Sequence, residues 1–388
     1  MKALVVERKP VRFAAARLAG GWEPGAGARV GPLRLAEVAE PALPGPAWHR
    51  VTPILSGICG SDLATVDGRG SRYFEPFVSF PFIPGHEVVG RLDDGTRVVI
   101  QPALHCAIRG IDPACEWCAK GFTNRCELVA FGHLEAGLQT GYCAGTGGGW
   151  GGSLVAHDSQ LHPAADDLDD RAAVMVEPAA CAVHAARQVA AGSVAGSVAV
   201  IGAGTLGLLT VAAVRHLVDP ERILIATAKH AEQRRWARVL GADMVVAPGE
   251  LARAVRRATN SRMVGRQLTG GVGAVVDCVG SARSIQQALS VVGPGGQVHL
   301  LGMPARVDLD LTALWHREIG LRGCYAYDRS DFEAAFDLVR HADLGRLVSA
   351  TYPIDRYVDA LDHAAHAGTR GAVKVAFDLA RTTRKARA

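Results

Sequence analysis

The chain has 388 residues, of which 49% are hydrophobic and 21% charged, and its formal net charge is +4. This composition excludes a disordered or fibrous protein, and no apolar run approaches the roughly 20 residues of a membrane-spanning helix. Because the length exceeds what one hydrophobic core usually supports, two domains are expected.

The chain opens with a predicted strand at residues 1–7, which lacks the longer apolar stretch of a signal peptide. Nine cysteines in a chain without an export signal are typical of metal ligands and reduced thiols rather than disulfides. We therefore expect a cytoplasmic protein. The one dense basic cluster, at residues 381–387, is interpreted as a solvated tail and not as an arm that binds nucleic acid.

Residues 1–165 are rich in glycine and proline, with short apolar runs between the turns. The runs at residues 48–55, 88–92 and 96–100 predict short strands and a β-rich, barrel-like domain. The segment 19–32, which is rich in glycine, is expected to be a loop inserted in this domain.

Two motifs in this domain carry candidate metal ligands, GICGSD at residues 57–62 and PGHE at residues 84–87. The thiolate of Cys59 and the imidazole of His86 together favour zinc, and the carboxylate of Glu87 offers a third ligand. Ser61, two residues past the cysteine, would place a hydroxyl near the open metal position. The alternative is a buried cysteine and an unrelated histidine in a turn.

A second metal motif follows, with four of the nine cysteines inside 21 residues and the spacing Cys-x8-Cys-x2-Cys-x7-Cys. Its members are Cys106, Cys115, Cys118 and Cys126. Four thiolates on one irregular loop would complete a closed tetrahedral zinc site and would order a segment with little core of its own. Chance clustering is the alternative. The cysteines without partner spacing are expected to be core or surface thiols: Cys143, Cys181, Cys278 and Cys324.

Beyond residue 168 the chain alternates between helical and apolar segments. An alanine-rich helix is predicted from residue 176 towards residue 191, with Pro178 in its first turn. Glu177, at the start of this helix, is either a capping residue stabilised by the helix dipole or a group that points at the metal.

A buried strand at residues 197–201 then leads into the pattern Gly-x-Gly-x-x-Gly, and a helix follows at residues 208–218. In this strand–turn–helix context the pattern indicates a dinucleotide site, with the pyrophosphate at the helix N-terminus. The expected contact residues are Gly202, Gly204, Thr205, Leu206 and Gly207. Further strands at residues 222–227, 274–279 and 297–302 predict a doubly wound parallel sheet.

An NAD site usually places an acidic residue after the second strand, about 20 residues beyond the glycines. Here that place holds Ala228, Lys229 and His230, and Arg234 follows. The missing carboxylate and the available cations favour a 2′-phosphate, so NADP(H) is predicted over NAD(H). The alternative is that these are ordinary basic residues on a solvated helix.

The last part of the chain has a mixed pattern, with helices predicted at residues 331–340 and 355–365 and a closing strand at residues 372–377. We interpret it as a return to the first domain.

In this combination and order, the motifs resemble the zinc-dependent medium-chain dehydrogenase/reductase superfamily of alcohol, polyol and threonine dehydrogenases, over essentially the whole chain. The resemblance implies an α/β fold with a GroES-like β-barrel catalytic domain and a Rossmann doubly wound parallel-sheet domain, with the active site in the cleft. The implied ranges are 1–170 for the catalytic domain, with a structural zinc lobe at about 104–128, then 171–324 for the Rossmann domain, and 325–388 for a C-terminal part that returns to the catalytic domain.

The resemblance also implies roles for the candidate residues. Cys59 and His86 match catalytic zinc ligands, while Glu87, Glu177 or a water supplies the remaining positions. The four clustered cysteines match a structural zinc site, and Ser61 matches the hydroxyl that touches the substrate oxygen. Relatives of this kind act on small molecules as dimers or tetramers, without nucleic-acid or membrane partners.

The sequence departs from the family pattern at several places. The first two lobe cysteines are separated by eight residues where two are usual, and Ala64 stands where many relatives have a histidine that extends the proton relay. Residues 73–82 hold five of the sixteen Phe and Tyr side chains. This aromatic segment predicts either core packing or an oligomer contact, or else an apolar pocket for a bulky substrate to which Trp150 adds a wall.

The predicted function is a zinc-dependent oxidoreductase that transfers a hydride between a nicotinamide cofactor and an alcohol or carbonyl substrate. One alternative is an NADPH-dependent reductase of a C=C or C=N bond on the same fold. A second alternative is a nucleotide-binding protein without catalytic activity.

Overall fold

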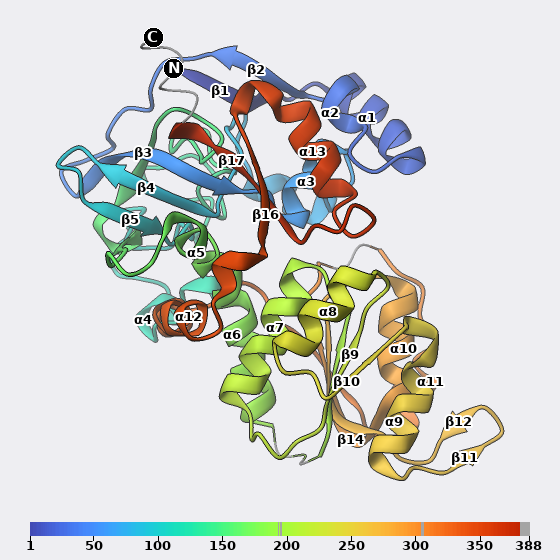
Figure 1. The fold of residues 1–388 in the computed structure, drawn as a ribbon. Coiled ribbons are helices and arrows are strands. Elements are labelled where there is room, and N and C mark those ends of the chain that lie inside the picture. The colour runs from blue at the N-terminus through green and yellow to red at the C-terminus, as the bar shows by residue number, and fades with distance from the viewer. Residues whose placement is uncertain (193, 195, 304–305, 381–388) are drawn as a thin grey trace. The chain divides into compact units, whose positions relative to one another are not determined.

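The computed structural model describes residues 1–192, 194, 196–303 and 306–380, so the predicted basic tail lies outside the described residues. The chain divides into two compact units, one of Met1–Glu177 with Asp343–Ala388 and one of Pro178–Ala342 (Figure 1). The return to the first unit therefore begins at Asp343 rather than at residue 325. The reason is that helix α12 (Arg329–His341) buries Phe332, Ala335 and Leu338 within the second unit.

The first unit is built on a mostly antiparallel sheet with the strand order β16-β17-β3-β4-β5-β7, in which β6 also pairs with β3. These strands are β3 (Trp48–Gly57), β4 (Val88–Leu92), β5 (Arg97–Ile100), β6 (Leu154–His157), β7 (Leu161–Pro163), β16 (Val348–Tyr352) and β17 (Lys374–Asp378). Strands β3, β4 and β5 confirm the short strands predicted from the sequence. A separate antiparallel pair is formed by β1 (Lys2–Val6) and β2 (Leu33–Glu37).

The segment expected to be an inserted loop is helical, which corrects that prediction. Helix α1 (Pro10–Trp22) starts with a proline in its first turn, where no backbone donor is lost, and helix α2 (Gly27–Val30) follows. A distant residue holds this segment, because the buried carboxylate of Asp67 accepts hydrogen bonds from the backbone N–H groups of Gly25, which lies between the two helices, and of Gly27, the first residue of α2. The glycine-rich sequence suggested a loop because Asp67, which supplies the hydrogen bonds, lies outside this segment.

The other helices of the first unit are short. They are α3 (Gly60–Val66), α4 (Glu116–Ala119), α5 (Asp170–Ala173) and α13 (Tyr357–Ala365), with 3-10 turns η1 (Arg72–Phe77), η2 (Thr123–Arg125), η3 (Asp158–Gln160), η5 (Leu344–Leu347) and η6 (Ile354–Arg356). The main core of this unit packs β1 against β17 and includes Trp150, which is fully buried beside Phe377. Trp150 is thus a core residue, and the suggestion that it lines a substrate pocket is wrong.

The second unit confirms the predicted doubly wound parallel sheet, in the strand order β10-β9-β8-β13-β14-β15. The strands are β8 (Val198–Ile201), β9 (Leu224–Thr227), β10 (Met244–Val246), β13 (Val272–Asp277), β14 (Val292–Leu300) and β15 (Gly320–Gly323). All neighbouring strands in it run parallel. The strand order reverses between β8 and β13, and ligands of such sheets bind at the carboxyl ends of the strands at that point.

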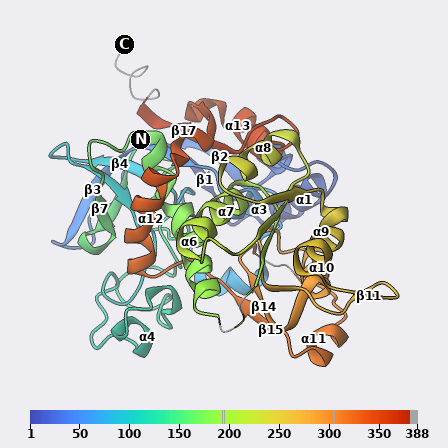
Figure 2. The same ribbon diagram turned by 60° about the horizontal axis from the view of Figure 1, so that its bottom comes forward.

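Helices flank this sheet on both faces (Figure 1). They are α6 (Val176–Ala190), α7 (Thr205–Leu217), α8 (Ala231–Val239), α9 (Leu251–Thr259), α10 (Ala282–Val291), α11 (Thr312–His316) and α12, with the 3-10 turn η4 (Pro248–Glu250). A hairpin of β11 (Met263–Val264) and β12 (Gln267–Leu268) projects from this unit in both views (Figure 2). No helix in the described part of the chain is long and apolar enough to cross a lipid bilayer.

Candidate active site

Two neighbouring strands bring the first group of candidate ligands together. Strand β3 ends two residues before Cys59, and β4 begins immediately after Glu87. The backbone N–H of Gly57 donates to the carbonyl of Glu87 at 2.9 Å. One ligand atom each from Cys59, His86 and Glu87 lies within 4.8 Å of the others. A soft sulfur, an imidazole nitrogen and a carboxylate oxygen at such separations fit the donor set and size of a zinc site.

The local conformation of the GICGSD motif explains the position of Cys59. Cys59 stands at the N-cap position of α3, where the Asp62 carboxylate accepts the backbone N–H of Cys59 at 3.0 Å. The other carboxylate oxygen of Asp62 lies 3.5 Å from Nδ1 of His86. A carboxylate behind a ligand histidine is the usual outer partner of a metal site, since it fixes the ring and leaves Nε2 for the ion.

Two acidic groups, Asp62 and Cys59, lie beside His86. His86 is buried, and burial alone would lower its pKa, but the charges of Asp62 and Cys59 raise the pKa of His86 well above its ordinary value. A buried imidazole that attracts a proton so strongly sits where a cation is favoured. The donor set and this field therefore both suit a divalent metal.

The sequence analysis missed Lys374, which forms a buried ion pair with Oε2 of Glu87 and also donates to the carbonyl of Ile58 at 3.2 Å. Burial lowers the pKa of Lys374, but the charges of Glu87, Cys59 and Glu177 together raise it above its ordinary value. Gly57 permits the pair, since a Cβ there would overlap the Glu87 carboxylate. The available signal was a lysine within the apolar run of the closing strand.

Glu177 lies in the first turn of α6 and is only 6% exposed. Its charge acts on Lys374, but it does not belong to the group of ligand atoms within 4.8 Å formed by Cys59, His86 and Glu87. The geometry therefore places Glu87 nearer to the other two candidate ligands than Glu177.

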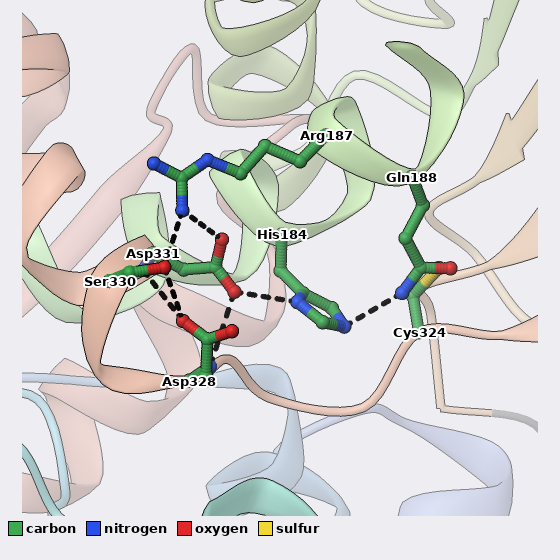
Figure 3. Close-up of polar contacts among 7 residues, drawn as sticks. All are labelled: His184, Arg187, Gln188, Cys324, Asp328, Ser330 and Asp331. Carbon is green, nitrogen blue, oxygen red and sulfur yellow. Dashed lines mark hydrogen bonds and ion pairs between the residues drawn. The ribbon is translucent and has the colours of Figure 1, made fainter. Parts of the chain in front are cut away.

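Helix α6 is held at its far end by a buried network in the second unit (Figure 3). Nδ1 of His184 contacts Asp331 at 2.7 Å, Arg187 donates to the other oxygen of Asp331 at 2.8 Å, and Gln188 contacts Nε2 of His184 at 2.7 Å. Asp331 also closes a capping box with Asp328 at the start of α12. The network ties α6 to α12.

This network predicts a dependence of stability on pH. Burial raises the pKa of Asp331, but the contacts with His184, Asp328 and Arg187 outweigh it and lower the pKa below its ordinary value. A depressed pKa in the folded state stabilises the protein above the unfolded pKa of about 3.9, and this contribution is lost as the pH falls through the folded pKa. Asp331→Asn should therefore cost about 1.5–3 kcal/mol at pH 7, and progressively less below pH ~4.

Urea denaturation of wild type and variant across this pH range measures the difference. A cost that stays the same from pH 7 down to about pH 3 would contradict the assignment of the charge to Asp331.

The four clustered cysteines form a second group, with their sulfur atoms within 4.8 Å of one another. The Sγ atoms of Cys106 and Cys126 are 3.6 Å apart, and all nine cysteines of the chain are free thiols. Burial raises the pKa of Cys118. Burial and the neighbouring Cys106 raise the pKa of Cys126 to about 11. In contrast, hydrogen bonds from the backbone of Glu127 and Cys118 lower the pKa of Cys115 to about 7. Four thiolates this close need a cation, and the donor set fits a closed zinc site.

Arg109 organises the segment around these cysteines and was also missed in the sequence. Its guanidinium is fully buried and donates to five backbone carbonyls, which belong to Leu104, Phe131, Leu134, Glu135 and Gly137. Burial lowers its pKa, while the nearby sulfurs of Cys143, Cys126 and Cys106 act in the opposite direction. A buried cation thus stands beside the four clustered cysteines.

A third group of possible ligands joins Glu23 to Asp362 and His366 of α13. Here the carboxylate of Asp362 already pairs with Arg370 at 2.5 Å and with Nδ1 of His366 at 3.2 Å, and Glu23 is exposed. The charge of Asp362 is therefore already balanced by the protein itself.

The predicted dinucleotide turn lies between β8 and α7, at the carboxyl end of the sheet. Gly202 has φ +91°, and a Cβ at Gly207 would overlap the carbonyl of Gly202, so both positions require glycine. A Cβ at Gly204 would meet no atom within 4 Å, which leaves open space before the N-terminus of α7 at Thr205 and Leu206. This turn fits a pyrophosphate.

The loop after β9 contains the residues predicted to select the cofactor. Ala228 is buried, Lys229 is exposed, and the guanidinium of Arg234 donates to the carbonyls of both, at 3.0 and 3.2 Å. The first carboxylate after the strand, Glu232, is paired with Arg235 at 2.5 Å. The loop thus presents positive charge and no unpaired carboxylate among its described residues.

Comparisons with known proteins agree with this organisation. A family model described as an alcohol dehydrogenase GroES-like domain matches residues 45–166, and one described as a zinc-binding dehydrogenase matches residues 205–341. D-arabitol-phosphate dehydrogenase of Enterococcus avium is 25% identical over 324 residues, which cover 79% of this chain and 84% of that protein. The probable D-xylulose reductase A of Arthroderma otae is 31% identical over 298 residues, which cover 73% of this chain and 77% of that protein.

Solved structures share the fold. A zinc-binding dehydrogenase from Sinorhizobium meliloti 1021, bound to NADP, superposes with a TM-score of 0.69 at 24% identity and covers 89% of this chain and 95% of that one. The expected combination of a GroES-like domain and a Rossmann-type domain is therefore confirmed.

Proposed function

Because the chain belongs to the zinc-dependent medium-chain dehydrogenase/reductase superfamily, whose named relatives are dehydrogenases and reductases, we propose that it is a zinc alcohol dehydrogenase that prefers NADP(H). The reaction is reversible hydride transfer between an alcohol carbon and the nicotinamide. The observation that carries the proposal is the convergence of Cys59, His86 and Glu87 within 4.8 Å.

In this proposal Cys59, His86 and Glu87 hold the catalytic zinc, with Glu177 as a carboxylate near enough to Lys374 to influence the same site. Bound zinc would supply a Lewis acid that polarises the substrate oxygen. Asp62 keeps the His86 ring in place, and Ser61 accepts the proton that the alcohol loses. The cysteines at 106, 115, 118 and 126 hold the structural zinc.

Aromatic contacts beside His86 support an apolar or bulky substrate. The rings of Phe80, Phe82 and Tyr142 form a chain, with centroids 5.2 and 5.3 Å apart, and Tyr142 lies 6.0 Å from the imidazole of His86. Phe82 is buried in the same core as Trp150, so of these rings only Phe80 and Tyr142, which are partly exposed, support an aryl or alkyl group over a sugar alcohol. We place the enzyme in the cytoplasm and expect a homo-oligomer.

The decisive experiment is a screen of alcohols and carbonyls with both cofactors, read at the nicotinamide absorbance, before and after metal chelation. We expect oxidation of secondary or aromatic alcohols that stops on chelation and returns with zinc. Reduction of an enone or imine by NADPH that persists after chelation would instead favour the C=C or C=N reductase.

Cofactor preference is a separate prediction. Lys229→Glu places a carboxylate where the 2′-phosphate of NADP⁺ is expected. The variant loses a charged hydrogen bond to the phosphate and gains a repulsion, which together should cost about 3 kcal/mol. The value of kcat/KM for NADP⁺ should therefore fall roughly 100-fold. The value for NAD⁺ should change little. Arg238→Glu, an exposed position further along α8, is the matched control. A wild-type preference for NAD⁺ would contradict the prediction.

A further inference from the structure

Helix α1 presents a stripe of large apolar side chains to the solvent. Val11, Leu18 and Trp22 are 83%, 71% and 93% exposed. Because successive residues of a helix are turned by about 100°, their spacings place these three side chains within about 40° of one another around the helix axis. Single exposed apolar residues are common on protein surfaces, but an aligned set of them indicates a surface that binds a partner.

The opposite face of α1 fixes the helix to the first unit. Ala16 and Gly20 are buried there, and a Cβ at Gly20 would overlap the side chain of Asp67. Phe13 packs against Phe80, with the ring centroids 6.2 Å apart. Since these contacts hold the helix, the exposed stripe is not needed for folding and is free to contact a partner.

The charged side chains of α1 are all positive, since the helix contains no acidic residue. Arg12 and Arg17 are both exposed, and they lie on opposite sides of the apolar stripe, each about 100–120° from its centre. Arg12 donates to the carbonyl of Gly31 at 3.4 Å, and neither arginine is paired with a carboxylate among the residues that the structure describes. An apolar stripe that carries a tryptophan and is flanked by cations is typical of a helix that lies in the headgroup region of an anionic bilayer.

A second copy of the chain is the other candidate partner for this stripe. Two α1 helices in contact would bring arginines together without a carboxylate from either helix, and such like-charge contacts are unfavourable. Glu23, the first acidic residue after the helix, already has a carboxylate oxygen within 4.8 Å of His366. The charge of α1 therefore favours an anionic lipid surface over self-association.

We propose that α1 is a docking helix that lies on the surface of an anionic lipid bilayer, with its apolar stripe among the headgroups and its two arginines on lipid phosphates. The helix has 13 residues, fewer than the roughly 20 that span a bilayer, so it would rest on the membrane without crossing it. It precedes residues 45–166, which the GroES-like family model matches. The expected absence of a membrane partner came from the family resemblance and does not extend to this insertion.

The test is sedimentation of the full chain with vesicles of phosphatidylserine and phosphatidylcholine, compared with vesicles of phosphatidylcholine alone. Wild type should bind the anionic vesicles, and more weakly as the salt concentration rises. Arg12→Gln combined with Arg17→Gln should lower the partition coefficient roughly 25-fold, which is about fivefold for each basic residue at an anionic surface. Leu18→Ser combined with Trp22→Ser should lower it by about 10-fold or more, because the apolar contact is lost.

Matched controls carry the same changes in the second unit. Trp315→Ser removes a tryptophan that is 78% exposed, and Arg253→Gln combined with Arg257→Gln removes two exposed arginines of α9. Both controls should bind vesicles as wild type does. Every variant keeps the basic tail at residues 381–387, so a difference between variants reports on α1 and not on the tail. Equal melting temperatures would show that each fold is intact.

The proposal is wrong if wild type does not bind the anionic vesicles at low salt, or if both α1 variants bind them as well as wild type does. It is also wrong if Leu18→Ser with Trp22→Ser lowers the oligomeric mass in solution while wild type binds no vesicles, because the stripe would then be a contact between copies of the chain. None of these results affects the proposed hydride transfer, since no residue of α1 belongs to the proposed active site.

Discussion

Cys59→Ala is expected to lower kcat/KM for alcohol oxidation by roughly 10³-fold or more, because a Lewis acid supplies several kcal/mol to the transition state. Cys59 provides one of the three donor atoms that converge within 4.8 Å. Its side chain is half-buried and small, so its loss removes little packing. The zinc content should fall by one ion per chain while the melting temperature stays within a few degrees of wild type.

The matched control is Cys118→Ala, which removes the same thiol from the other cluster. This segment has only the short helix α4 and the turn η2 as regular structure among its described residues, so it has little core to fold on without an ion. Structural zinc contributes about 10–16 kcal/mol of binding free energy in zinc-finger peptides. Cys118→Ala should therefore lose zinc, melt at a lower temperature and become sensitive to proteolysis.

Measuring kcat/KM, zinc content and melting temperature for both variants separates the two roles. A stable Cys118→Ala protein without activity would contradict the division of the two sites. So would a Cys59→Ala protein that keeps both its zinc and its turnover.

The parts of the site that the sequence predicted depend on local chemistry. The Gly-x-Gly-x-x-Gly turn and the strand before it are specified by a few consecutive residues, because the positive φ of Gly202 and the contact at Gly207 exclude other side chains. The four cysteines form one cluster in the structure for a similar reason, as they lie close in the chain.

The residues that the sequence did not reveal are brought in by strand pairing and loop packing. Asp62 follows Cys59 closely in sequence, yet its contact with His86 exists only because β3 pairs with β4. Tyr142 and Arg109 contact partners that their own surroundings in the sequence do not indicate. The helical insertion at α1 and α2 was mistaken for a loop because Asp67 supplies the hydrogen bonds that order it.

The burial of Lys374 leads to the second large prediction, the effect of Lys374→Met on stability. The side chains of Lys374 and Glu87 are 2% and 1% exposed and form an ion pair. Removing one member of a buried pair leaves an uncompensated charge and typically costs about 3–5 kcal/mol. For a unit of this size the melting temperature should fall by roughly 6–20 °C in metal-free protein.

The same argument predicts a rescue. Lys374→Met combined with Glu87→Gln removes both charges and replaces the pair by neutral groups of similar volume, a change that is often close to neutral in stability. The double variant should recover most of the lost melting temperature, although it gives up a proposed zinc ligand and should remain inactive. Glu87→Gln alone should also be destabilised, since it leaves the lysine buried without its partner.

Added zinc distinguishes the charge effect from simple loss of packing. An ion held by Cys59, His86 and Glu87 would neutralise the carboxylate that Lys374 normally balances, so zinc should raise the melting temperature of Lys374→Met by more than that of wild type. An equal shift in both proteins, or a double variant as unstable as Lys374→Met, would mean that the lysine contributes through its apolar stem and not through its charge.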